Sequence, residues 1–195
     1  QFHQNMGNHL EAINGYKKFL DIAEHNSIIE DNSLAHHYHA LAWQYKYGDR
    51  MREAETYYRK SLTIIQNISN TDERLIFINI EALAEIELEF TNYNQAKILF
   101  EKMLEMAIKN FSDEHSRVAG VYFKLGIVYY KLGQKDLAEE NWMKVVNITK
   151  SLGYRTDDTK NKAVIYIAEL YRKAGDETKA QKFFDDNYVE PNVLY

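Results

Sequence analysis

Alanine recurs at a constant step of 42 residues along this chain of 195 residues. The alanines of this series are Ala12, Ala54, Ala96, Ala138 and Ala180. Four positions after each comes an aromatic residue, in the series Tyr16, Tyr58, Phe100, Trp142 and Phe184. Self-similarity at a period of this size is the signature of a repeat array. Stacked repeats present an extended surface rather than a closed pocket, so the period predicts a binding protein.

A second series with the same step marks the other half of each repeat. Its small residues are Ala42, Ala84, Gly126 and Ala168, and each directly follows Leu or Ile. Around both series the apolar residues recur with the 3.6-residue period of a helix, which predicts two helices per repeat. The predicted first helices span 34–47, 76–90, 118–131 and 160–173. The predicted second helices span 10–24, 52–67, 94–109, 136–150 and 178–187.

Glycine marks the predicted turn from the first helix to the second. Gly7, Gly133 and Gly175 share one register, and each is predicted to end a first helix in the left-handed conformation. Gly48 is displaced by one position from this register, and the third repeat has Thr91 and Asn92 instead.

Composition favours long helices and argues against several kinds of partner. The chain has one proline and 8 glycines, so few residues would interrupt a helix. A net charge of −5 gives no electrostatic support for binding nucleic acid or an anionic membrane. No apolar stretch approaches the roughly 18 residues of a membrane span, and no signal peptide is visible. The lack of cysteine excludes disulfides and thiolate metal sites, and we expect a cytoplasmic protein.

The fourth repeat carries a recognisable motif. From Val121 to Trp142 it has an aromatic residue, Leu-Gly, Tyr, Gly, Ala and an aromatic residue in order. This pattern resembles the tetratricopeptide repeat, and the fifth repeat matches nearly as well. The usual period of that family is 34 residues. The longer step resembles the repeats of kinesin light chains and of bacterial peptide-sensing regulators.

The resemblance implies an all-α, right-handed α-solenoid of antiparallel helix pairs. We expect one solenoid over residues 1–187, with a partial repeat at 1–33 and four full repeats at 34–75, 76–117, 118–159 and 160–187. Residues 188–195 would form a C-terminal tail or a cap. The register places the front half of the first repeat before Gln1, so we expect the chain to be part of a longer protein.

In this family the first helices line the concave surface, and the helical period identifies their unburied side. Tyr38, Leu41, Ala42 and Tyr45 form the predicted buried stripe of the first helix at 34–47. We call the residues of the opposite stripe, over all four first helices, the free face. The free face consists of His36, His39, Trp43, Lys46, Tyr47, Glu81, Glu85, Glu89, Phe123, Ile127, Tyr130, Lys131, Lys162, Ile165, Glu169, Arg172 and Lys173.

The free face combines apolar anchors with segregated charge. Aromatic residues with a polar group are typical interface anchors, and Trp43 and Tyr130 are of this kind. Glu81, Glu85 and Glu89 form a row of like charges, which disfavours a helix unless something compensates them. A basic group of a bound ligand would compensate them, and so would a nearby lysine of the protein itself.

Glu87 interrupts the predicted buried stripe. It stands where the other repeats have Tyr45, Tyr129 and Tyr171. A buried carboxylate without a partner is costly, so either Glu87 is paired or the helix rotates to expose it. We favour rotation or partial exposure.

Little in the sequence points to catalysis or a metal. His36, His37 and His39 are clustered, and His36 and His39 share a helix face, with Glu81 as the nearest candidate for a third ligand. No regular metal-binding spacing accompanies them, so we expect a polar rim of the groove and no metal site. We find no phosphate-binding glycine loop and no Ser/His/Asp set, and we expect no enzymatic activity and no cofactor.

The expected function is therefore recognition of a protein or peptide in the concave groove. In this interpretation the chain is the ligand-sensing or scaffolding part of a larger protein, such as a bacterial transcription regulator. Two alternatives stay open: a structural array that drives self-assembly, and a regulator that acts on a partner enzyme. The sequence predicts no direct contact with nucleic acid or membrane, and it does not specify an oligomeric state.

Overall fold

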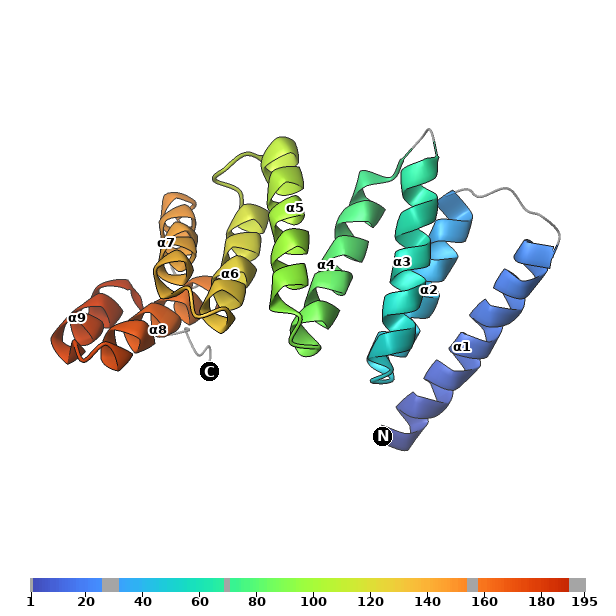
Figure 1. Ribbon diagram of the computed structural model, residues 1–195, viewed down its shortest axis with the longest axis horizontal. Coiled ribbons are helices and arrows are strands. Elements are labelled where there is room, and N and C mark those ends of the chain that lie inside the picture. The colour runs from blue at the N-terminus through green and yellow to red at the C-terminus, as the bar shows by residue number, and fades with distance from the viewer. Residues whose placement is uncertain (1, 26–31, 69–70, 154–157, 190–195) are drawn as a thin grey trace. The chain divides into compact units, whose positions relative to one another are not determined.

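A computed structural model describes residues 2–25, 32–68, 71–153 and 158–189, without the side chains of residues 2–8 and 24. The described chain forms two compact units, Gln1–Phe90 (unit 1) and Thr91–Tyr195 (unit 2). Within the described residues all regular structure is helical (Figure 1). None of the described helices is both long enough and apolar enough to cross a bilayer.

Unit 1 contains four consecutive helices that pack each on the next. They are α1 (Phe2–His25), α2 (Asn32–Tyr47), α3 (Met51–Asn67) and α4 (Glu73–Glu89). The first helices predicted at 34–47 and 76–90 are α2 and α4, and the second helix predicted at 52–67 is α3. All three predictions are correct to within three residues at each end.

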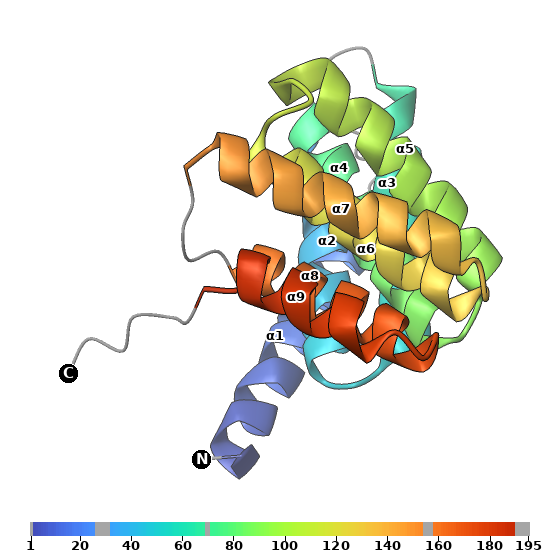
Figure 2. The same ribbon diagram turned by 90° about the vertical axis from the view of Figure 1, so that its left-hand side faces the viewer.

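Unit 2 continues the alternation with five helices. They are α5 (Tyr93–Phe111), α6 (Ser116–Lys131), α7 (Lys135–Ser151), α8 (Asp158–Lys173) and α9 (Glu177–Asn187). Helices α6 and α7 pack as one pair and α8 and α9 as another. Figure 2 shows α9 lying along α8 on the side that faces the viewer.

A three-residue turn joins each first helix to its second helix, and its geometry repeats with the 42-residue period. The left-handed residue of the turn is Asp49, Thr91, Gly133 or Gly175, with φ between 59° and 87°. At the turn after α6, the Gln134 N–H donates to the Tyr129 carbonyl and the Gly133 N–H to the Tyr130 carbonyl. These bonds form the motif that ends a helix at a left-handed residue.

One prediction about the glycines was wrong. Gly48 stays outside the register of the turns, because Asp49 takes the left-handed conformation and so keeps the period. Gly7 does not end a helix, because α1 runs without a break from Phe2 to His25.

The small residues of the two series allow the helices of a pair to approach closely. Ala54, Ala96, Ala138 and Ala180 of the second helices are fully buried. The aromatic residues Tyr58, Phe100 and Trp142, one turn later, are fully buried as well. Ala12 and Tyr16 on α1 are half-buried.

Gly126 shows why one repeat departs from alanine. A Cβ atom built on Gly126 would lie 2.2 Å from Nε1 of the Trp142 indole, closer than real Cβ atoms come to any atom. The indole occupies this space and donates from Nε1 to the Phe123 carbonyl at 3.2 Å. Glycine at position 126 and tryptophan at position 142 are therefore a matched pair.

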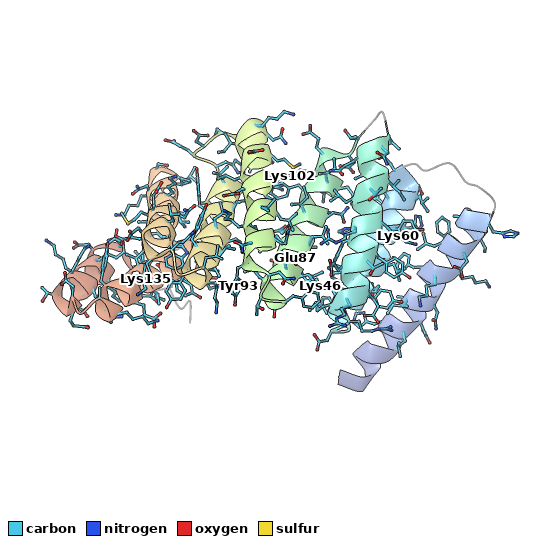
Figure 3. All side chains as sticks on the ribbon, in the orientation of Figure 1. Lys46, Lys60, Glu87, Tyr93, Lys102 and Lys135 are labelled. Carbon is cyan, nitrogen blue, oxygen red and sulfur yellow. The ribbon has the colours of Figure 1, made fainter. Side chains whose placement is uncertain are left out.

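Glu87 does not rotate out of the buried stripe, so the favoured interpretation was wrong and the alternative of a paired carboxylate is correct. Glu87, labelled in Figure 3, lies on α4 and is 4% exposed. It accepts a hydrogen bond from Nη2 of Arg59 on α3 at 2.7 Å. One period later, the hydroxyl of Tyr129 donates to Glu101 at 3.0 Å. Position 59 corresponds to 101 and position 87 to 129, so equivalent positions are linked in both repeats. The carboxylate is on the first helix in one repeat, as Glu87, and on the second helix in the other, as Glu101.

Candidate partner-binding face

The free face of α2 is open and its opposite side is closed. Trp43 is 45% exposed and Tyr47 is 65% exposed. On the other side of the helix, Tyr38, Leu41, Ala42 and Tyr45 are at most 4% exposed. The helical period therefore separated the buried and accessible sides of α2 correctly.

The remaining helices show the same separation. All seventeen residues of the free face are at least partly exposed. Ile165 on α8 is 42% exposed, while Phe123, Ile127 and Tyr130 on α6 are half-buried. Unit 1 contributes the part of the free face on α2 and α4, and unit 2 the part on α6 and α8.

A lysine of the protein pairs with the middle member of the glutamate row. Nζ of Lys46 on α2 donates to Glu85 on α4 at 2.6 Å. Glu81 and Glu85 are half-buried and Glu89 is exposed. For Glu85 the compensating charge is thus a lysine of the protein itself.

The basic residues in unit 2 also interact within the protein. Nζ of Lys173 donates to the hydroxyl of Tyr130 at 2.8 Å, and this bond is the main reason why the pKa of Lys173 is raised. Arg172 lies 3.2 Å from Glu177 and Lys162 is paired with Asp158. All of these pairs are on the surface, where ion pairs contribute little to stability.

The three histidines do not converge on one point. Nε2 of His36 lies 3.3 Å from Asp72, and His37 Nδ1 lies 2.7 Å from the Ser33 carbonyl. His39 instead bonds to Asn79 on α4. Within the described residues no group of three or more His, Asp or Glu side chains could hold a metal ion.

A buried chain of hydrogen bonds fixes the proton on His39. Ser61 on α3 donates from its hydroxyl to the Ala35 carbonyl at 2.7 Å, so its lone pair accepts from Nδ2 of Asn79 at 2.8 Å. Asn79 then presents its carbonyl oxygen to Nδ1 of His39 at 2.8 Å. A carbonyl oxygen only accepts, so Nδ1 carries the proton and Nε2 keeps its lone pair.

Burial favours this neutral form of His39. Desolvation lowers the pKa of His39, and the nearby His36 lowers it further, while the bond to Asn79 acts in the opposite direction. Sequence reasoning missed Ser61 and Asn79, which are both fully buried. The sequence did contain a signal that Ser61 and Asn79 are buried polar residues. The equivalent positions 42 residues later hold the apolar residues Met103 and Val121.

Tyr166 on α8 is a further member of the aromatic surface that the sequence did not single out. Its ring stacks on Trp142 with centroids 4.9 Å apart and lies 5.9 Å from the ring of Phe123. Tyr166 is 36% exposed, so it extends the accessible aromatic surface beside Phe123 and Ile165.

The chain after α9 returns to α8. Nδ2 of Asn161 donates to the Val189 carbonyl at 2.7 Å, and the Val189 N–H donates back to Oδ1 of Asn161 at 3.3 Å. The beginning of the predicted tail is thus held against the N-terminal turn of α8. Residues 190–195, for which the sequence predicted a tail or a cap, lie outside the described residues.

Three comparisons bear on this geometry. The tetratricopeptide repeat family model matches residues 76–151. The comparison with curated proteins gave no significant match. Among solved structures, a kinesin light chain of Podosopora anserina with nearly identical TPR-like repeats gives a TM-score of 0.76 at 19% identity. That likeness covers 92% of this chain and 85% of the other.

Two further solved structures are similar. The MamA protein gives a TM-score of 0.64 at 21% identity, over 93% of this chain and 87% of that chain. A Rap protein complexed with Competence and Sporulation Factor gives a TM-score of 0.63 at 21% identity, over 95% of this chain and 49% of that chain. The family match and the shared arrangement of helix pairs together show that the chain is a repeat protein with the tetratricopeptide fold.

Proposed function

We propose that the chain is a protein- or peptide-binding module whose partner binds the free face. The observation that carries this proposal is the exposure of large apolar side chains on that face. Trp43 and Tyr47 in unit 1 and Ile165 in unit 2 are each more than 40% exposed, beside helix sides that are almost completely buried. Aromatic side chains that are exposed and held by a rigid helix are typical anchors of interfaces.

The similar structures support binding as the role of this fold. The Rap protein, of which 49% is similar to this chain, was solved in complex with Competence and Sporulation Factor. Repeat proteins of this kind generally use their extended surfaces for recognition.

The biological setting that we infer is the ligand-sensing or scaffolding part of a larger regulator. In this role the apolar anchors Trp43, Phe123, Ile127 and Tyr130 would hold the partner, and the charged residues of the free face would set its direction. Self-assembly through the same exposed side chains is the second candidate, since such side chains also serve contacts between identical chains.

A peptide-library screen tests the proposal. The wild type and the double variant Trp43→Ala/Tyr130→Ala would be screened against the same immobilised peptides. We expect a set of peptides that bind the wild type and are lost or weakened at least about tenfold in the variant, since anchor residues dominate binding energy. Identical binding profiles would show that Trp43 and Tyr130 do not anchor the partner.

Light scattering at several protein concentrations tests self-assembly, the second candidate. A monomer at every concentration contradicts it.

A further inference from the structure

Three residues of the free face in unit 1 form a continuous stripe along α2. His39, Trp43 and Tyr47 are spaced four residues apart, so each lies about one helical turn from the next. The Trp43 and Tyr47 rings are adjacent, with centroids 4.7 Å apart. The ring of His9 on α1 lies 5.1 Å from that of Tyr47 and continues the stripe beyond α2.

His39 contributes an acceptor whose direction the interior fixes. The chain of bonds from Ala35 through Ser61 and Asn79 leaves the Nε2 lone pair of His39 unused. His39 is half-buried. Its Nε2 can accept a hydrogen bond from a ligand that reaches this edge of the ring.

Trp43 and Tyr47 contribute aromatic faces. Both rings are substantially exposed, at 45% for Trp43 and 65% for Tyr47. The face of an indole or phenol ring carries partial negative charge and attracts cations. A planar cation can also stack on such a ring.

The charges of the free face in unit 1 favour a cationic ligand. Its α2 and α4 residues include three carboxylates, Glu81, Glu85 and Glu89, and one ammonium group, Lys46. The ammonium group of Lys46 pairs with Glu85. The ligand groups that fit this surface are thus donors with positive charge and a flat, stackable shape.

We propose that the stripe formed by His39, Trp43 and Tyr47 binds the guanidinium group of an arginine side chain in the partner. The guanidinium would stack on the two aromatic rings and donate one N–H to Nε2 of His39. This inference rests on the proposed function and names one side chain that the partner must contain. Arginine fits better than lysine because it is planar, more weakly hydrated and carries five donors.

The test uses the full chain and three synthetic peptides. Each is a nonapeptide of glycine and serine that carries two arginines, two lysines or two citrullines, the last being a neutral isostere of arginine. Binding is followed by NMR through the two indole N–H signals. Trp142 is fully buried and serves as the internal control for Trp43.

We expect the arginine peptide to shift the Trp43 indole signal and to leave the Trp142 signal unchanged. Its affinity should exceed that of the lysine peptide about threefold or more, and that of the citrulline peptide about tenfold or more. The double variant Trp43→Leu/Tyr47→Leu should lose at least about tenfold in affinity for the arginine peptide. Ile98→Ala removes a 54% exposed apolar side chain from α5 and is the matched control, with unchanged affinity.

Equal affinities for the arginine and citrulline peptides would overturn the inference, and so would an arginine peptide that leaves Trp43 unshifted. The proposed function can fail separately. A library peptide that binds through Tyr130 but is insensitive to Trp43→Leu/Tyr47→Leu leaves the binding module in place and removes the arginine site. A library without any binding peptide contradicts both.

Discussion

At the scale of single residues, position 126 accepts only glycine without strain, because the Trp142 indole fills the space that a side chain would occupy. We expect Gly126→Ala to lower the free energy of unfolding by about 2 kcal/mol, because the new methyl group would overlap the Trp142 indole. Gly120→Ala on the same helix is the matched control, since nothing lies within 4 Å of its Cβ position. Urea unfolding should show that control unchanged or stabilised by up to about 1 kcal/mol.

A second substitution tests whether overlap with the Trp142 indole is the cause of the lost stability in Gly126→Ala. In the double variant Gly126→Ala/Trp142→Phe the repeat takes the combination of Ala84 and Phe100 from the preceding repeat. The smaller ring should recover part of the stability that Gly126→Ala loses. A double variant less stable than the sum of the two single variants would contradict the matched pair.

The linked positions 59 and 87 allow a second prediction. Arg59→Glu should destabilise the protein by about 2 kcal/mol or more, because it places a carboxylate beside the buried carboxylate of Glu87. Adding Glu87→Tyr should restore most of this loss, since the pair then matches Glu101 and Tyr129. Thermal unfolding measures both variants, and Arg52→Glu, at an exposed position of α3, controls for the charge change. If the stability changes caused by Arg59→Glu and Glu87→Tyr simply add, the positions 59 and 87 are not equivalent to 101 and 129.

His39 gives the protein a dependence on pH. Its pKa is lower in the folded protein than the ordinary value of 6.5, so the unfolded chain binds the proton more readily. The free energy of unfolding should therefore be highest above about pH 6.5 and should decline as the pH falls through 6.5 toward the folded-state pKa. The groups around the imidazole are Asn79 on α4, Tyr58 on α3 and His36 on α2.

Urea unfolding at a series of pH values measures this dependence. The variant His39→Gln does not titrate in this range, and the difference between wild type and variant isolates the contribution of His39 from those of the other histidines. Parallel curves for the two proteins would show that His39 has the same pKa in the folded and unfolded chain.

At the scale of the helices, backbone strain occurs in the turns that join the helices of a pair, where Asp49 and Thr91 have positive φ. Thr91 holds φ at 60°, a conformation that is unfavourable for a β-branched residue and that Gly133 adopts without cost one period later. We expect Thr91→Gly to raise the free energy of unfolding by about 1 kcal/mol. The converse substitution Gly133→Thr should lower it by about 1–2 kcal/mol, because no atom lies near its Cβ position and backbone strain is the main effect.

Differential scanning calorimetry checks both turns in one experiment. Asn94→Gly, at an exposed position in the first turn of α5, is the control for introducing glycine nearby, and it should not stabilise. A loss of stability in Thr91→Gly would mean that the threonine side chain makes up for its backbone strain.

The helices themselves were predictable from the chain because each is amphipathic and each repeat restates the pattern. The limits of α2, α4, α6 and α8 agree with the predicted first helices to within three residues. The extra length of α1 was not predicted, since Gly7 carries the register of a turn and yet lies within a helix. A glycine permits the left-handed conformation but does not enforce it.

At the scale of the whole molecule, the net charge of −5 predicts an absence of non-specific binding to nucleic acid. Fluorescence anisotropy with a labelled 20-base-pair duplex at physiological salt should give a dissociation constant weaker than about 100 µM, the weak end of the range for non-specific binders. Tighter binding that weakens steeply with added salt would reveal a basic surface that the composition conceals.

The sequence by itself determined the repeat period, the two helices of each repeat and the side of each first helix that stays accessible. These features follow from local periodicity, which every residue of a helix shares with its neighbours. The tertiary structure decided how the polar residues within that frame are used. It paired Glu87 with Arg59 and Lys46 with Glu85, and it joined His39 to Ser61 through Asn79. Each of these bonds joins different helices across many residues of sequence, so a pattern along one helix cannot specify it.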